Sequence, residues 1–130
     1  MDVLASRLLL RPRDPARTRA FYRDVLGLAV AREFGPADDP GTVFHAGGGF
    51  LEVSGRGSTG PSPDTVLWLQ VRDVRAEHAR LAAAGATVRR EPRVEPWGLV
   101  EAWVEDPDGL RIVLVEVPAD HPLRRDVRAL

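Results

Sequence analysis

The pattern of apolar and polar residues predicts the same series of strands and helices twice along the chain. The first copy begins with an apolar, extended segment at residues 4–11, and Asp14 then provides a good N-cap for a helix. Pro15 suits the first helical position, where its missing N–H costs nothing, and Gly27 marks the end of the helix. Short apolar segments bounded by Gly and Pro then predict three strands, at residues 29–34, 42–46 and 50–54.

The second copy repeats these elements in the same order. We expect a strand at 65–71, a helix at 74–84 that is opened by Asp73 and ended by Gly85, and strands at 87–94, 99–105 and 110–117. The two Asp residues lie 59 positions apart and the two Gly residues 58 apart (73 − 14 and 85 − 27). The chain is therefore predicted to have an α+β fold made of two tandem βαβββ modules, whose curved sheets surround a shared cavity.

The same pattern gives the domain boundaries. One domain is expected over 1–130, with module one at about 4–54, a Gly/Ser/Pro-rich linker at 55–63 and module two at about 64–117. An Arg-rich tail at 118–130, with Arg124, Arg125 and Arg128, is expected either to form a short helix or to stay loose. Gly47–Gly49 is interpreted as a hairpin turn and the DPDG sequence at 106–109 as a tight turn.

Composition excludes several classes of function. A net charge of −1 gives no support to nucleic acid or an anionic membrane as a partner. The chain has no Cys, which excludes disulfides and thiol chemistry, and all 18 basic residues are Arg, which excludes a lysine Schiff base. No long apolar run indicates a signal peptide or membrane span, so a cytoplasmic location is expected.

Three features together resemble a known family. The segments FYRDVLGL and WGLVEAWVEDPDGLRIVLVE, with the doubled βαβββ order, are similar to the vicinal oxygen chelate superfamily over residues 4–117. This superfamily includes glyoxalase I, extradiol dioxygenases, fosfomycin-modifying enzymes and bleomycin-resistance proteins. The resemblance implies paired modules around one cavity, commonly completed in a homodimer. It also implies a divalent metal held by His or Glu at four positions, on the first and last strand of each module.

The repeat places those four positions at Arg7, Glu52, Val66 and Val113. Only Glu52 can ligate a metal, since Val has no donor atom and Arg is a permanent cation. No metal and no cofactor are therefore expected, although a site formed by His45 and Glu52 stays open as an alternative. If Arg7 and Glu52 face each other, an ion pair replaces the metal, and it either neutralises a remnant pocket or contacts a charged ligand group.

Strand alternation selects the remaining candidate residues, because alternate side chains share a face. Trp68 and Trp103 fall on the predicted cavity face with Gln70 and Glu101, and Trp97 lies in a loop at the rim. Two tryptophans on one face with a few polar neighbours are typical of a mostly apolar pocket, although either one alone can simply fill a core. The ligand-binding residues predicted from the sequence are Arg7, His45, Phe50, Glu52, Trp68, Gln70, Trp97, Glu101, Trp103 and Arg111.

The sequence thus predicts a metal-independent, homodimeric protein of the bleomycin-resistance type that binds a small planar or aromatic molecule, such as an antibiotic or a metabolite, and sequesters it. An enzyme of the same fold is the alternative: a lyase, isomerase or dioxygenase that uses an atypical metal site, or metal-free acid–base catalysis by Glu52 or Glu101. A third hypothesis is a vestigial pocket in a protein that serves protein association.

Overall fold

A computed structural model describes residues 1–123. The first half contains β1 (Arg7–Leu10), α1 (Pro15–Ala20), the π-helix η1 (Phe21–Val25), β2 (Val30–Phe34), β3 (Gly41–Ala46) and β4 (Gly49–Val53). The second half contains β5 (Val66–Gln70), α2 (Val74–Ala83), β6 (Thr87–Val94), β7 (Val100–Glu105) and β8 (Arg111–Glu116). The βαβββ order predicted from the sequence is confirmed in both halves.

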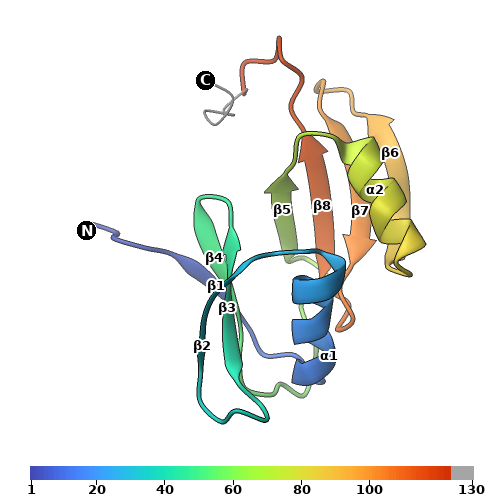
Figure 1. Cartoon of the computed structure of the whole chain (residues 1–130). Coiled ribbons are helices and arrows are strands. Elements are labelled where there is room, and N and C mark those ends of the chain that lie inside the picture. Colours follow the sequence, from blue (N-terminus) through green and yellow to red (C-terminus); the bar gives the residue numbers. More distant parts are fainter. Residues whose placement is uncertain (124–130) are drawn as a thin grey trace.

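Each half forms its own four-stranded sheet (Figure 1). Sheet A has the strand order β1-β4-β3-β2 and sheet B the equivalent order β5-β8-β7-β6. In both sheets the first strand pairs in parallel with the last, and the other pairs are antiparallel. The two sheets do not close into a barrel, so each has a core face and a face open to the outside, which we call the open face.

Both helices begin as the sequence predicts. The Asp14 carboxylate accepts a hydrogen bond from the backbone N–H of Arg17 (3.2 Å), and Asp73 accepts one from the N–H of Ala76 (3.0 Å). The first helix differs from prediction in its second half, where it widens into η1 and the Leu26 N–H bonds the Phe21 carbonyl, five residues back. This wider turn lies where the helix contributes Phe21 and Tyr22 to the core.

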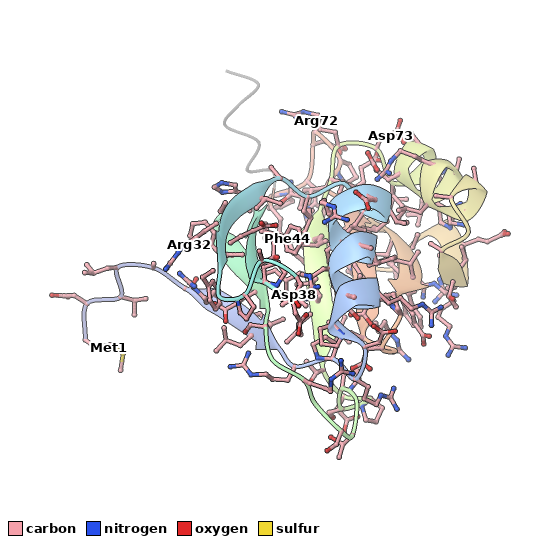
Figure 2. All side chains as sticks on the ribbon, turned by 60° about the horizontal axis from the view of Figure 1, so that its bottom comes forward. Met1, Arg32, Asp38, Phe44, Arg72 and Asp73 are labelled. Atoms are coloured by element: carbon pink, nitrogen blue, oxygen red, sulfur yellow. The ribbon has the colours of Figure 1, made fainter. Side chains whose placement is uncertain are left out.

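The main hydrophobic core joins the helices to the core faces of both sheets, and a second, smaller cluster contains Val113 and Val115 from the open face of sheet B. Figure 2 shows Phe44 of β3 between sheet A and the first helix. Complete burial of side chains of this size contributes roughly 1.5–3 kcal/mol each, so the shared core holds the two halves together. Its fully covered members include Tyr22, Phe44, Leu51, Val53, Val74, Leu81, Ala102, Val104 and Ile112.

A buried hydrogen bond also connects the two halves. The Tyr22 hydroxyl donates to Oδ2 of Asp106 at 2.7 Å, and Oδ1 of Asp106 accepts from the backbone N–H groups of Asp108 and Leu110. Asp106 therefore shapes the predicted DPDG turn and fixes that turn to η1. The sequence indicated only the first of these roles.

The N-terminal residues lie away from the core. The first strand was predicted over 4–11 but spans only Arg7–Leu10, because its partner β4 begins at Gly49 and leaves the preceding residues without a neighbouring strand. Residues 1–6 form an extended arm with Met1 at its tip (Figure 2). The predicted tail is described only to Leu123, so Arg124, Arg125 and Arg128 lie outside the described residues.

Candidate functional site

The ten residues predicted to bind a ligand lie on or beside the open faces of the two sheets. Strand register settles this, because residues directly opposite each other in a sheet point to the same side. On sheet A, Leu9 pairs with Glu52 and Glu52 with Val43. On sheet B, Trp68 pairs with Val113 and Val113 with Trp103. Glu52 and Val113 therefore hold equivalent places in the two sheets, in agreement with the assignment made from the repeat.

An ion pair occupies the open face of sheet A. Nη1 of Arg7 lies 2.8 Å from Oε1 of Glu52, so the condition under which the sequence gives an ion pair here is met. The other carboxylate oxygen, Oε2, accepts a hydrogen bond from the Ser54 hydroxyl at 2.6 Å, and Nη1 of Arg11 lies 3.9 Å from it. Arg11 also donates to the Ser54 hydroxyl at 2.7 Å. Both oxygens of Glu52 are therefore engaged by side chains of the chain itself.

These contacts determine the charge of Glu52. Hydrogen bonds from Ser54 and then Arg7 hold the pKa of this carboxyl below its ordinary value of 4.5, against the opposing effect of burial. Glu52 is thus an anion at neutral pH and a weak proton acceptor. This environment disfavours the hypothesis that Glu52 acts as a general base.

Two other predicted residues share this face. Phe50 pairs with both Arg7 and His45, and the His45 and Phe50 rings lie 5.4 Å apart between centroids. His45 is exposed, and its imidazole makes no hydrogen bond or ion pair with the described residues. The structure places these two rings beside the Arg7–Glu52 pair.

The open face of sheet B is aromatic at its centre. Trp68, Val113 and Trp103 form a row across three neighbouring strands, which we call the tryptophan row. Trp68 is 51% exposed, a large value for an indole on a sheet. The guanidinium carbons of Arg90 and Arg111 lie 4.0 and 4.9 Å from the centroid of the Trp103 ring. These distances are those of cation–π contacts, which hold Trp103 in place.

Polar residues lie beside the tryptophan row. Oε2 of Glu101 accepts a hydrogen bond from Nε1 of Trp97 at 2.8 Å. Trp97 is itself exposed in the loop between β6 and β7, where its carbonyl lies 3.0 Å from Nε2 of His121. Gln70 lies in register with Val115 and Glu101 on the same face. The structure thus brings the six predicted residues of the second half to one surface.

The predicted residues nevertheless form two groups. Within residues 1–123, no hydrogen bond, ion pair or ring contact joins the sheet A group to the sheet B group. Sequence reasoning also missed three participants: Ser54 and Arg11, which bond the Glu52 cluster, and Arg90, which stacks on Trp103. Arg11 follows Arg7 and Leu9 at alternate positions and so shares their face, but only the structure shows its bond to Ser54.

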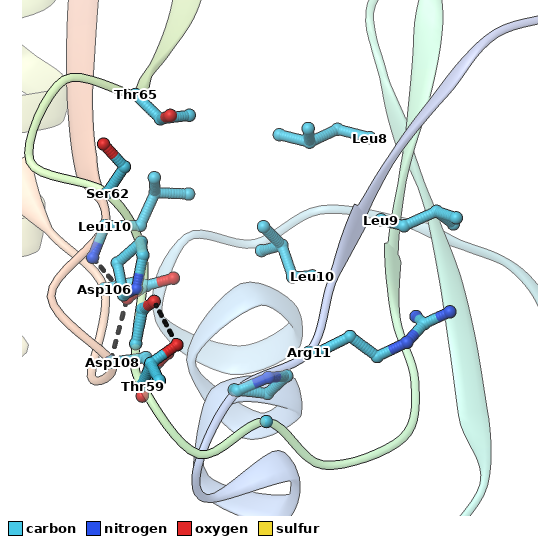
Figure 3. A pocket seen from close by; sticks show the side chains of 14 residues that line it. Leu8, Leu9, Leu10, Arg11, Thr59, Ser62, Thr65, Asp106, Asp108 and Leu110 are labelled. Atoms are coloured by element: carbon cyan, nitrogen blue, oxygen red, sulfur yellow. Dashed lines mark hydrogen bonds between the residues drawn. The ribbon is translucent and has the colours of Figure 1, made fainter.

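A separate cavity of about 300 Å³ lies between β1, the linker and the turn before β8 (Figure 3). Leu8, Leu9 and Leu10 line one side, and Asp106 and Asp108 lie on the other. None of the ten predicted residues lines it. Asp106 and Asp108 already bond Tyr22 and Arg13, respectively. We therefore locate the candidate site on the open faces, where ring surface and charge lie exposed.

The sequence matches one family model. Residues 5–114 match the Glyoxalase/Bleomycin resistance protein/Dioxygenase superfamily. The chain belongs to this superfamily. No functionally curated protein matches the chain significantly.

Solved structures share the fold of this superfamily member. TioX from Micromonospora sp. ML1 superimposes with a TM-score of 0.74 at 22% identity, over 86% of this chain and 97% of TioX. TnmS3, an antibiotic binding protein from Streptomyces sp. CB03234, gives a TM-score of 0.74 at 22% identity, over 90% and 98%. A superfamily member from Sphaerobacter thermophilus DSM 20745 gives 0.72 at 21% identity, over 89% and 98%.

The metal site that the superfamily resemblance implies does not fit the residues of this chain. Of the four positions, Val66 and Val113 lack donor atoms, Arg7 is a cation, and both oxygens of Glu52 already accept hydrogen bonds. In the part of the chain that the structure describes, no three His, Asp or Glu side chains gather as a metal-binding group. The described residues also contain no helix long and apolar enough to cross a membrane.

Proposed function

We propose that this protein binds a small planar or aromatic molecule, such as an antibiotic or metabolite, without a metal ion and releases it chemically unchanged. The observation that carries this proposal is the contrast between the two open faces. The metal-ligand positions hold an Arg7–Glu52 ion pair and two valines, whereas the indole of Trp68 lies half exposed in the same row as the fixed indole of Trp103, with Val113 between them. Such a surface suits stacking on a flat ligand.

The complete cavity requires a second copy of the chain. Leu9, Val66 and Trp68 remain 49, 40 and 51% exposed on the open faces, next to the buried Val113 and Val115 of sheet B. Burying apolar surface of this kind is favourable by roughly 25 cal/mol per Å². In the proposed homodimer, sheet A of one copy covers sheet B of the other, so a ligand lies between the charged face and the aromatic face.

Fluorescence titration tests the binding proposal. The chain has three tryptophans, and an aromatic ligand stacked on Trp68 quenches part of their emission. Against a panel of planar antibiotics, Trp68→Ala should weaken binding at least about tenfold, since stacking contributes roughly 1–3 kcal/mol per ring. Trp68→Phe is the matched control, because it keeps an aromatic face, and it should retain most of the affinity.

Two further measurements separate the alternatives. Mass spectrometry of the ligand after incubation should detect the starting compound unchanged. Elemental analysis should find divalent metal only at background level, on the order of a tenth of an ion per chain or less. A transformed ligand would establish an enzyme, with Glu101 as the first candidate because no ion pair engages it among the described residues. A dimer that binds no member of the panel would favour protein association instead.

A further inference from the structure

The open face of sheet B carries an arginine without an acidic partner. The Arg111 side chain forms no ion pair and donates no hydrogen bond to any described residue, and its guanidinium lies against the Trp103 ring. The neighbouring acids are already engaged. Glu105, which pairs with Arg111 in the strand register, bonds Arg89 at 2.5 Å, and Glu95 bonds both Arg90 and Arg93.

Unsatisfied donors gather around the same indole. Buried nitrogen and oxygen atoms without a hydrogen-bond partner are few in folded proteins, because each costs roughly 1–3 kcal/mol. Within the described residues, three of the six such side-chain atoms belong to this cluster: Nε of Arg90, Nε1 of Trp103 and Nε of Arg111. All three are donors. Arg90 has an acidic partner, Glu95, through another of its nitrogens, so among the described residues it is Arg111 and the Trp103 N–H that lack an acceptor.

We infer that Arg111 binds the anionic group of the ligand, and that this protein therefore selects flat aromatic acids, such as aryl carboxylates, over neutral or cationic analogues. This inference rests on the proposed function and names the ligand class for the same surface. A carboxylate suits the guanidinium because it accepts two parallel charge-assisted hydrogen bonds. The ring of the same ligand then lies over the tryptophan row.

The arrangement of charges also fixes the direction of the ligand. Arg111 lies one register row before the tryptophan row, and Glu101 lies one row after it. Four residues along a strand separate these two rows, which corresponds to roughly 13 Å. Glu101 repels an anion, so an aromatic acid bound across the tryptophan row has its acidic group at the Arg111 end and its neutral end near Glu101.

Calorimetric titration with three probes of equal shape tests the inference: 2-naphthoate, 2-naphthamide and 2-naphthylmethylamine. Wild type should bind 2-naphthoate roughly 10- to 100-fold more tightly than the amide, the range expected for charge-assisted hydrogen bonds, and should bind the amine most weakly. This selectivity is measured on the unaltered protein, so it does not depend on the folding of any variant.

Two substitutions then locate the anion site. Arg111→Met should abolish the preference for naphthoate while leaving naphthamide affinity within about threefold, and Arg111→Lys should restore part of the preference. Arg75→Met is the matched control, because it removes the same charge from an exposed position on α2, which packs against the core side of sheet B. Arg75→Met should leave all three affinities unchanged.

The failure of this inference differs from failure of the proposed function. If wild type binds the amide or amine as tightly as naphthoate, or if Arg75→Met lowers naphthoate affinity as much as Arg111→Met, the assignment of Arg111 is wrong while aromatic binding stands. If no naphthalene probe and no member of the antibiotic panel binds, both are wrong.

Discussion

The hydrogen bond between Tyr22 and Asp106 offers a sharp test of how the two halves are held together. Tyr22→Phe removes one hydroxyl and leaves the ring, which packs edge-on against Phe21 with centroids 5.1 Å apart. The hydroxyl donates to a carboxylate at 2.7 Å in a site where Tyr22 is fully covered and Asp106 is 5% exposed. Water cannot replace the lost donor without repacking.

A hydrogen bond to a charged group contributes about 1.5–3 kcal/mol. Asp106 keeps two backbone N–H donors at its other oxygen, so the cost should fall near the middle of this range, at about 2 kcal/mol at pH 7. Thr18→Val is the matched control. It also removes a buried hydroxyl, but Oγ1 of Thr18 has no hydrogen-bond partner within residues 1–123, so its loss should change stability by less than about 0.5 kcal/mol.

The cost of Tyr22→Phe should also depend on pH. Burial raises the pKa of Asp106 above its ordinary value of 3.8, and the hydrogen bond from Tyr22 opposes that rise, so Tyr22→Phe raises the pKa further. The hydroxyl therefore stabilises the ionised carboxyl, and its contribution is present above the folded pKa of Asp106 and diminishes as pH falls through it. Urea denaturation at several pH values measures this. Equal losses for Tyr22→Phe and Thr18→Val, or a loss that stays constant with pH, would refute the reasoning.

Three further predictions follow from the same structure. Tyr22 is the single tyrosine of the chain, and burial and then Asp106 raise its pKa well above 10.0. Folded protein at pH 10.0 should therefore show no phenolate absorbance at 295 nm, whereas in urea-denatured protein Tyr22 should be half ionised. Glu52→Gln should cost about 1 kcal/mol at pH 7, and because the folded pKa of Glu52 is lowered, the difference should shrink as pH falls from 4.5 through that folded pKa in urea denaturation. The triple variant Arg7→His, Val66→His, Val113→Glu restores ligating side chains at the superfamily positions, and elemental analysis after exposure to Zn²⁺ should find bound metal that wild type does not retain; no gain in metal would contradict the assigned positions.

The sequence predicted the elements well because their signals are local. Asp14 and Asp73 cap the helices through hydrogen bonds to residues only three positions further along the chain. Gly27 and Gly85 adopt positive φ values of 81° and 84° after the helical segments. The repeat likewise placed Arg7 and Glu52 on the first and last strands of one module, where the structure shows them paired. These features depend on neighbouring residues or on one register, and the repeat allowed each half to be checked against the other.

Contacts between distant segments were not predictable in the same way. Tyr22 and Asp106 lie 84 positions apart, and the DPDG turn explains Asp106 without any reference to Tyr22. The widening of the first helix into η1 has no sequence signal that distinguishes it from a regular α-helix. Sequence periodicity also cannot tell which sheets face each other, because the two halves share one pattern and a partner sheet can come from the same chain or from a second copy.

The two halves of the repeat carry different chemistry on equivalent surfaces, and this difference links ligand binding to assembly. Sheet A presents ion-paired side chains around Glu52, whereas sheet B presents the tryptophan row and Arg111, which has no acidic partner among the described residues. A flat acid held on sheet B alone leaves its second ring face in water, and sheet A of a second copy covers that face in the proposed homodimer. Because a ligand that contacts both copies binds the dimer more tightly than the monomer, it must by linkage stabilise the dimer by the same factor. Ligand affinity should therefore rise with protein concentration until dimerisation is complete.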